Sequence, residues 1–196
     1  MAVRRVLLTL SVVDLPLTDV AGIDASGFER GHASLRYTKR TNLTIQQSKT
    51  TLPVDAAADA TLDIHAATRG NETLVAPRVS RRNADSAGVL TGDDGYDDRM
   101  IRQPARDYGA RPRIEHREFI SLHNARDMRL DGRSITERVT AAIEQRSGAF
   151  VQSRVRWKQF RELVIGCVVH DVERAFVIVA FGRFYSIVFV SRCYRQ

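Results

Sequence analysis

Cysteine is scarce in this chain of 196 residues, and its scarcity excludes several classes of protein. Only Cys167 and Cys193 are present, and they form neither a CxxC pair nor a zinc-ligand spacing. A disulfide framework in a small secreted domain requires more cysteines than these two. Cys167 falls within an apolar helical pattern, so we expect a buried free thiol in a protein of the cell interior.

Several motifs that carry chemistry are also missing. The chain has no Gly-rich phosphate loop, no HExxH zinc motif and no GxSxG nucleophile turn. Its five histidines are scattered, which is more typical of structural or solvated side chains than of metal ligands. These absences disfavour P-loop nucleotide-binding proteins, zinc peptidases and serine hydrolases.

Long uninterrupted apolar runs are lacking at both ends. The C-terminal run FVIVAFGRFYSIVFV contains Gly182 and Arg183, and it is shorter than the about 20 apolar residues that span a bilayer. The N-terminal residues 1–17 carry two arginines before a short apolar run, but no signal-peptide cleavage site follows closely. We therefore expect no membrane partner. A membrane-associated or secreted protein is therefore the least favoured functional class.

Acidic residues are fewer than basic ones. The chain has 30 Lys plus Arg residues, nearly all of them arginine, against 23 Asp plus Glu, which gives a net charge of +7. Because the guanidinium group makes forked contacts with phosphate, this balance favours a nucleic-acid partner. A basic surface that serves only solubility is the simpler alternative. The length and the 43% apolar content fit one globular domain.

The order of apolar patterns predicts a mixed α/β fold. Three consecutive strands are predicted within residues 18–24, 43–54 and 60–67, with a DAAADA turn between the last two. Helices are predicted at 71–82, 97–108, 134–150 and 157–176, and further strands at 88–92 and 111–116. The predicted order βββ-α-β-α-β-α-α gives a five-stranded mixed sheet with helices on both faces, which is the ribonuclease H-like order. In the last helix, the predicted core residues are Trp157, Phe160, Val164, Cys167, Val168, Val172 and Ala175.

Three acidic residues occur where two-metal chemistry requires carboxylates. Asp24 closes the apolar run VAGID, Asp93 follows VLTG, and Glu137 lies four residues after Arg133 on a predicted helix. Magnesium ions prefer oxygen ligands, and a metal pair requires acids that converge from separate elements. We expect Asp24 and Asp93 at strand ends along one sheet edge, and Glu137 away from the core stripe of its helix. Each acid taken alone is more simply interpreted as a solvated carboxylate.

Longer strings around these acids carry a family resemblance. They are YTKRTNLTIQQSKTTLPVD (37–55), LTGDDGYDD (90–98), RPRIEHREF (111–119) and WKQFRELVIGCVVH (157–170). From Asp24 to about Ala175, roughly three quarters of the chain, the sequence resembles the DDE transposases of insertion sequences, specifically the insertion-sequence-five type.

The resemblance implies a ribonuclease H-like catalytic domain in which Asp24, Asp93 and Glu137 are the catalytic and metal-binding residues. They would bind two Mg²⁺ ions, with Mn²⁺ as a substitute. The implied activity is metal-dependent phosphodiester cleavage and strand transfer at insertion-sequence ends. The implied partners are double-stranded DNA, as element ends and as target, and further copies of the chain in an active homo-oligomer. The implied location is cytoplasmic and nucleoid-associated.

Basic side chains near these acids are candidates for DNA binding. Arg133 keeps the family's spacing of arginine, three residues and glutamate relative to Glu137. Phosphate contacts supply most protein–DNA hydrogen bonds, so clustered cations that flank the acids in sequence are favoured for this role, with a solvated basic face as the alternative. These further candidates are Lys39, Arg40, Arg154, Arg156 and Lys158.

The sequence also departs from the family pattern. Asp94, Glu115 and Glu144 are acidic where the family usually has a basic residue, and each change would weaken attraction to phosphate. Only 23 residues precede Asp24, so we expect a chain truncated at its N-terminus. The predicted domains are a poorly defined segment 1–17, the catalytic domain 18–176, and an apolar tail 177–196 that does not resemble the family. An inactive transposase remnant with weak, non-specific DNA binding is therefore the alternative function.

Overall fold

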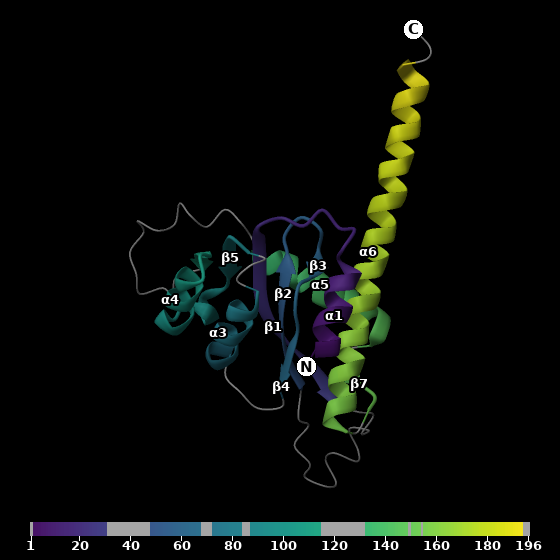
Figure 1. Ribbon diagram of the computed structural model, residues 1–196. Helices are drawn as coiled ribbons and strands as arrows, with labels where there is room; N and C mark the ends of the chain where they lie inside the picture. The colour runs from purple at the N-terminus through teal and green to yellow at the C-terminus, as the bar shows by residue number, and fades with distance from the viewer. Residues whose placement is uncertain are drawn as a thin grey trace.

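The protein is built around a central mixed sheet with helices packed against it (Figure 1). The computed structural model describes residues 2–30, 48–67, 72–83, 87–114, 132–148, 150–153 and 155–193. In chain order, the elements are α1 (Ala2–Ser11), β1 (Val20–Arg30), β2 (Ser48–Asp55), β3 (Ala60–Thr61), β4 (His65–Ala67), α3 (Glu72–Arg82), β5 (Val89–Gly92), the 3₁₀ turn η2 (Asp94–Tyr96), α4 (Arg99–Asp107), β6 (Arg111–Ile114), α5 (Gly132–Ser147), β7 (Phe150–Val151) and α6 (Arg156–Cys193).

The strand order and directions confirm the predicted fold class. The main path of the sheet is β3-β2-β1-β5-β6, in which β1, β2 and β3 are antiparallel, and β5 and β6 run parallel to β1. This is the mixed, ribonuclease H-like arrangement that the element order predicts. The single strand predicted at 60–67 is split into β3 and β4, which both pair with β2, and β7, which pairs with β1, was not predicted. Strands of two or three residues are too short to produce a periodic signal.

Helices cover both faces of the sheet, as predicted. On one face, Leu52 and Val54 of β2 pack against α1, α5 and α6. On the other face, Ala21 and Ile23 of β1 pack against α3 and α4. Cys167 lies in the first of these cores as a buried free thiol, and burial raises its pKa. The predicted burial of this free thiol is therefore confirmed.

Strand β1 corrects one prediction about the acids. The sequence pattern predicts that the first strand closes at Asp24, but β1 continues to Arg30, so Asp24 lies in its interior. The strand continues because β2 pairs with it from Ala21 to Phe28, and β7 pairs with its last two residues. Cross-strand pairing, which is not visible in the local sequence, sets the length of this strand.

Both ends of the described chain contain more helix than the apolar patterns predict. Helix α1 lies within the segment 1–17, for which no element was predicted. Helix α6 does not end near residue 176 but continues to Cys193, and it projects beyond the rest of the protein in Figure 1. Within the described residues, no helix combines the length and the apolar character that a bilayer crossing requires.

Trp157 and Val172, predicted in the core stripe of α6, are exposed instead.

Candidate active site

Asp24 and Asp93 occupy neighbouring positions on two parallel strands. The paired register of β1 and β5 ends with Ile23 beside Gly92, and the next residue along each chain is Asp24 and Asp93 respectively. Adjacent strands lie about 4.8 Å apart, so this register brings the two backbones side by side at the acids. The two residues are separated by 69 positions in the sequence, and only the sheet brings them together.

The strand alternation also defines which face these positions share. Leu52, the register partner of Asp24, belongs to the core beneath α5 and α6, whereas Ile23 belongs to the opposite core. Asp24 therefore lies on the face that α5 covers. A Cβ at Gly92 would meet Ile23 and Tyr96 on the opposite face. Alternation then puts the position of Asp93 on the α5 face as well.

Both acids are half-buried and interact with nearby backbone. An oxygen of Asp24 accepts a hydrogen bond of 2.7 Å from the backbone N–H of Ala25. Asp93 accepts one of 3.1 Å from the backbone N–H of Gly95, within the turn η2 that follows β5. These contacts hold each carboxylate close to its own strand.

Glu137 lies on α5, which packs across β1, β2 and β5. Thr136 and Val139 are buried on the sheet side of α5, whereas Glu137, about 100° around the helix from Thr136, is exposed. The predicted position of Glu137 off the core stripe is thus confirmed. Within the described residues, no group of three or more His, Cys, Asp and Glu side chains is close enough to hold a metal ion. The chemistry of the three carboxylates suits Mg²⁺, and the register accounts for two of them as a pair.

The predicted DNA-binding residues fall into two groups. Arg156 and Lys158 lie exposed in the first turn of α6. Their neighbour Trp157 is flanked by cations, with Lys158 5.6 Å and Arg161 5.4 Å from its ring centroid. Arg133 lies in α5, and its side chain is outside the described part of the chain. The remaining candidates also lie outside the described residues: Lys39, Arg40 and Arg154.

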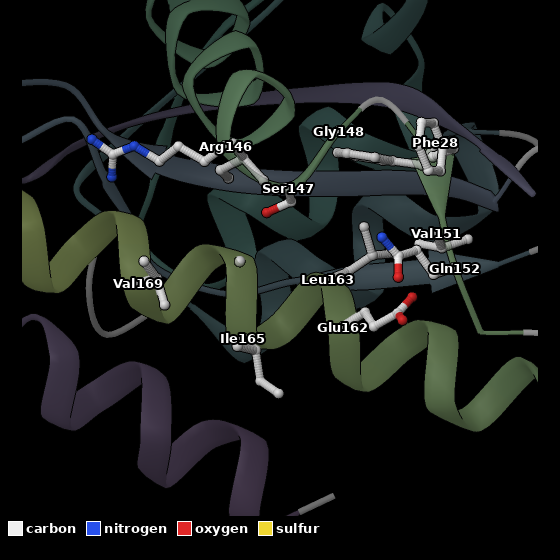
Figure 2. A pocket seen from close by; sticks show the side chains of 13 residues that line it. Phe28, Arg146, Ser147, Gly148, Val151, Gln152, Glu162, Leu163, Ile165 and Val169 are labelled. Atoms are coloured by element: carbon white, nitrogen blue, oxygen red, sulfur yellow. The ribbon is translucent and has the colours of Figure 1, made fainter. Parts of the chain in front are cut away.

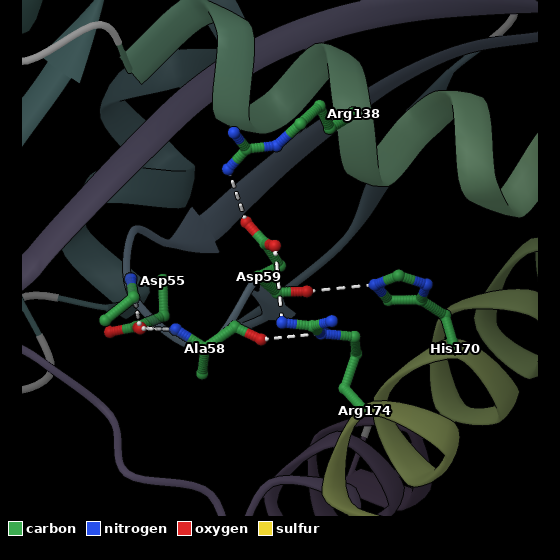
Figure 3. Close-up of polar contacts among 7 residues, drawn as sticks. Asp55, Ala58, Asp59, Arg138, His170 and Arg174 are labelled. Atoms are coloured by element: carbon green, nitrogen blue, oxygen red, sulfur yellow. Dashed lines mark hydrogen bonds and ion pairs between the residues drawn. The ribbon is translucent and has the colours of Figure 1, made fainter. Parts of the chain in front are cut away.

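A polar network around Asp59 was missed by sequence analysis (Figure 3). Asp59, in the turn between β2 and β3, forms ion pairs with Arg138 of α5 at 2.8 Å and with Arg174 of α6 at 3.4 Å. His170 Nε2 lies 2.9 Å from the Asp59 carbonyl oxygen. Burial lowers the pKa of His170, so the neutral ring donates this hydrogen bond. The network fixes α5, the helix of Glu137, relative to the sheet.

A second group of buried charges joins α1 to the far side of the sheet. Asp63 forms ion pairs with Arg82 of α3 at 2.7 Å and with Arg4 of α1 at 3.3 Å. Burial lowers the pKa of Arg4, and the negative charge of Asp63 opposes that effect. These contacts are structural, because they join α1, α3 and the segment between β3 and β4, and none of the three residues is adjacent to Asp24 or Asp93.

A pocket of about 330 Å³ lies between the end of α5, β7 and α6 (Figure 2). Phe28, Ile143 and Leu163 supply much of its apolar lining. Its charged side chains already have partners, since Arg146 pairs with Glu173, and Glu162 accepts hydrogen bonds from Ser153. None of the three acids lines this pocket, so it is separate from the candidate active site.

Comparisons with known proteins give structural similarity only. No protein-family model matches the chain, and no curated protein matches it in sequence. The catalytic core domain of BIV integrase is similar in structure, with 8% identity, a TM-score of 0.46, and coverage of 79% of this chain and 80% of that one. A chain of the simian T-cell lymphotropic virus intasome in complex with PP2A regulatory subunit B56 gamma shares 10% identity, with a TM-score of 0.46. That match covers 79% of this chain and 48% of the other. The fold assignment rests on the strand order and directions, and the two matches carry no residue roles.

Proposed function

We propose that this protein is a DDE-type nucleotidyl transferase acting on DNA, and specifically the catalytic domain of an insertion-sequence transposase. The observation that carries the proposal is the register of β1 and β5, which brings Asp24 and Asp93 to neighbouring positions. Both positions lie on the sheet face that α5 covers, and α5 bears Glu137. The net charge of +7 and the family resemblance support DNA as the substrate.

In this proposal the three acids would contribute metal ligands from different elements of the fold. Asp24 and Asp93 would supply oxygen ligands from the sheet, and Glu137 would supply a further ligand from α5. Two Mg²⁺ ions, when bound, would activate water and stabilise the attacking and leaving oxygens. Water attacks the phosphorus at the element end, the P–O3′ bond breaks, and a 3′-hydroxyl is released. That hydroxyl then attacks a target phosphodiester in line, which forms the new strand and releases a target 3′-hydroxyl.

The cations position the DNA around this reaction. Arg156 and Lys158 are exposed at the start of α6, where they are available to phosphate oxygens. The role extends to the other sequence candidates, Arg133, Lys39, Arg40 and Arg154. Such contacts carry no base specificity, so they serve double-stranded element ends and target alike. A homo-oligomer would hold two element ends together, and the protein would act at the nucleoid.

An inactive remnant with weak DNA binding is the second candidate function. The acidic residues Asp94, Glu115 and Glu144, at positions where the resembling family usually has cations, favour it. Each removes a potential phosphate contact, so binding would be weaker and less specific. DNA binding without any metal-dependent cleavage would select this alternative.

A nicking assay with metal substitution tests the proposal. The purified chain is incubated with supercoiled plasmid in Mg²⁺, Mn²⁺, Ca²⁺ or a chelator, and nicked circles are counted. We expect cleavage in Mg²⁺ and Mn²⁺, and a loss of about 100-fold or more in Asp24→Asn, Asp93→Asn and Glu137→Gln. Asp107→Asn is the matched control, because Asp107 is an exposed carboxylate on α4 whose contact is with Gln103.

The variants separate this activity from contamination. Equal nicking by the wild type and all three acid variants would show that the cleavage does not come from this site. Calorimetric titration with Mn²⁺ gives a second readout, in which Asp24→Asn and Asp93→Asn should weaken metal binding while Asp107→Asn should not. Unchanged metal binding in both would overturn the assignment of the acids.

A further inference from the structure

An exposed apolar stripe runs along α6. Its members recur at alternating intervals of four and three residues: Ile165, Val169, Val172, Phe176 and Val179. The side chains are far from buried, with Phe176 75%, Ile165 57% and Val172 52% exposed. Intervals of four and three are the heptad repeat of a coiled-coil seam, in which a second helix covers the apolar positions. We call these five residues the α6 stripe.

Charged residues precede the α6 stripe in the sequence. Lys158 and Glu162 occupy the two preceding positions of the same heptad repeat, and no apolar residue continues the pattern there. An apolar seam that begins after charged residues has a defined register, because those residues disfavour burial. Val172 is the central member of the stripe.

Helix α1 extends the apolar surface sideways. It runs parallel to α6: the Arg4 guanidinium lies 5.7 Å from the Phe160 ring centroid, and Ser11 lies 3.2 Å from Asp171. Figure 1 draws the two helices side by side. Leu8 of α1 points into the core, whereas other apolar residues of this helix are exposed: Val3, Val6, Leu7 and Leu10. Leu7 lies about 100° around α1 from Leu8, on the same flank as Arg4 and Ser11, so it borders α6.

We propose that the α6 stripe and the adjoining residues of α1 form the interface with a second copy of this chain. The five stripe residues are all between 42% and 75% exposed, and Leu7 of α1 borders them at 41%. A contiguous row of exposed apolar side chains marks a protein interaction site more often than a free surface. The heptad spacing makes the stripe complementary to itself, which favours an identical partner over an unrelated one.

The shape of the protein fits this partner. Helix α6 lies at one side of the sheet and projects beyond the domain in Figure 1, and the exposed stripe residues face away from the core that α6 covers. In a twofold-symmetric interface, a residue at the centre of the patch lies near its own counterpart. Val172 is therefore the position where a new charge is most disruptive. The α6 interface rests on the proposed function only for its biological role, because the homo-oligomer that would hold two element ends requires a contact surface between copies.

Sedimentation of the full chain without DNA tests the interface. We expect wild type to be dimeric at about 100 μM, and Val172→Glu and Phe176→Glu to raise the dimer Kd by at least about 10-fold. Met100→Glu is the matched control, because Met100 is 64% exposed on α4, which packs against the opposite face of the sheet from α6. Circular dichroism confirms that each variant remains folded. Assembly measured in this way is independent of DNA cleavage, so failure of this proposal is distinguishable from failure of the catalytic one.

Cysteine cross-linking gives a second readout. In a Cys193→Ser background, Val172→Cys should form a disulfide-linked dimer under mild oxidation, whereas Met100→Cys should form no disulfide-linked dimer. Buried Cys167 should not interfere. A wild-type chain that is monomeric at about 100 μM would overturn the proposal. A dimer that neither Val172→Glu nor Phe176→Glu weakens would also overturn it. So would a monomeric chain that sediments with anionic phospholipid vesicles and loses this binding in both glutamate variants.

Discussion

The carboxylate of Asp171 on α6 accepts a 2.8 Å hydrogen bond from the backbone N–H of Thr61, 110 residues earlier in the chain. The Ser11 hydroxyl lies 3.2 Å from the other carboxylate oxygen and 2.9 Å from the Leu8 carbonyl oxygen. Asp171 is fully buried, and burial raises its pKa to about 7. Because a serine hydroxyl has a single proton, a protonated Asp171 allows both contacts at once: it donates to Ser11, which donates to Leu8.

This pKa predicts a specific pH dependence of stability. Between its ordinary value of 3.8 and about 7, the folded protein keeps the Asp171 proton that the unfolded chain releases. The free energy of unfolding should therefore fall as the pH rises through this window, by at most about 1.4 kcal/mol per pH unit. Urea unfolding of wild type and Asp171→Asn at pH 5, 6, 7 and 8 measures it. The advantage of wild type over the variant should shrink with pH, and a constant difference would contradict the prediction.

Asp59 predicts a difference between two substitutions that both remove its carboxylate. Its φ of 52° lies in the left-handed region, which glycine adopts without strain and alanine does not. Asp59→Gly and Asp59→Ala both lose the ion pairs with Arg138 and Arg174. We expect Asp59→Ala to be less stable than Asp59→Gly by about 1 kcal/mol, measured by urea unfolding. Arg138→Ala should cost less than about 1 kcal/mol, because its side chain is 60% exposed. Equal stability of the two Asp59 variants would argue against backbone strain.

The start of α6 predicts a change in the salt dependence of DNA binding. If Arg156 and Lys158 each contact a phosphate, Arg156→Ala and Lys158→Ala should each reduce the slope of log K against log salt concentration by about 0.9. Fluorescence anisotropy with a labelled duplex provides the readout. The salt concentration is varied about fourfold, from about 50 to about 200 mM. Arg106→Ala, an exposed arginine on α4, serves as control and should leave the slope unchanged. If Arg156→Ala and Lys158→Ala both leave the slope unaltered, as the control does, the DNA binds elsewhere on the protein.

Glu144 predicts a gain of binding. It is half-buried on α5, two helical turns beyond Glu137, where the resembling family has lysine. Glu144→Lys should tighten binding to duplex DNA at low salt and steepen the salt slope by about 0.9, and Glu144→Gln should have a smaller effect. The same anisotropy assay measures both variants. No gain from Glu144→Lys would show that this part of α5 does not approach DNA.

Much of the fold was predictable, because the apolar periods of strands and helices are local. The order of the main strands and of the helices on both faces follows from those periods, and so does the exposure of Glu137. The interior position of Asp24 in β1 was not predictable, since β2 and β7 extend that strand by pairing. The network of Asp59, Arg138 and Arg174 left no signal, because its members are joined only by folding.

The sequence by itself determined which side chains share a face, because helical and strand periods depend only on residue spacing. Val164, Cys167 and Val172 illustrate the limit of that rule, since the sequence pattern predicts all three in one core stripe along one side of α6. Tertiary structure decided which part of this side is covered: α1, α5 and the sheet pack over Val164 and Cys167, whereas Val172 stays exposed. It also decided that Asp24 and Asp93 are neighbours, because the parallel register of β1 and β5 is a relationship between distant segments.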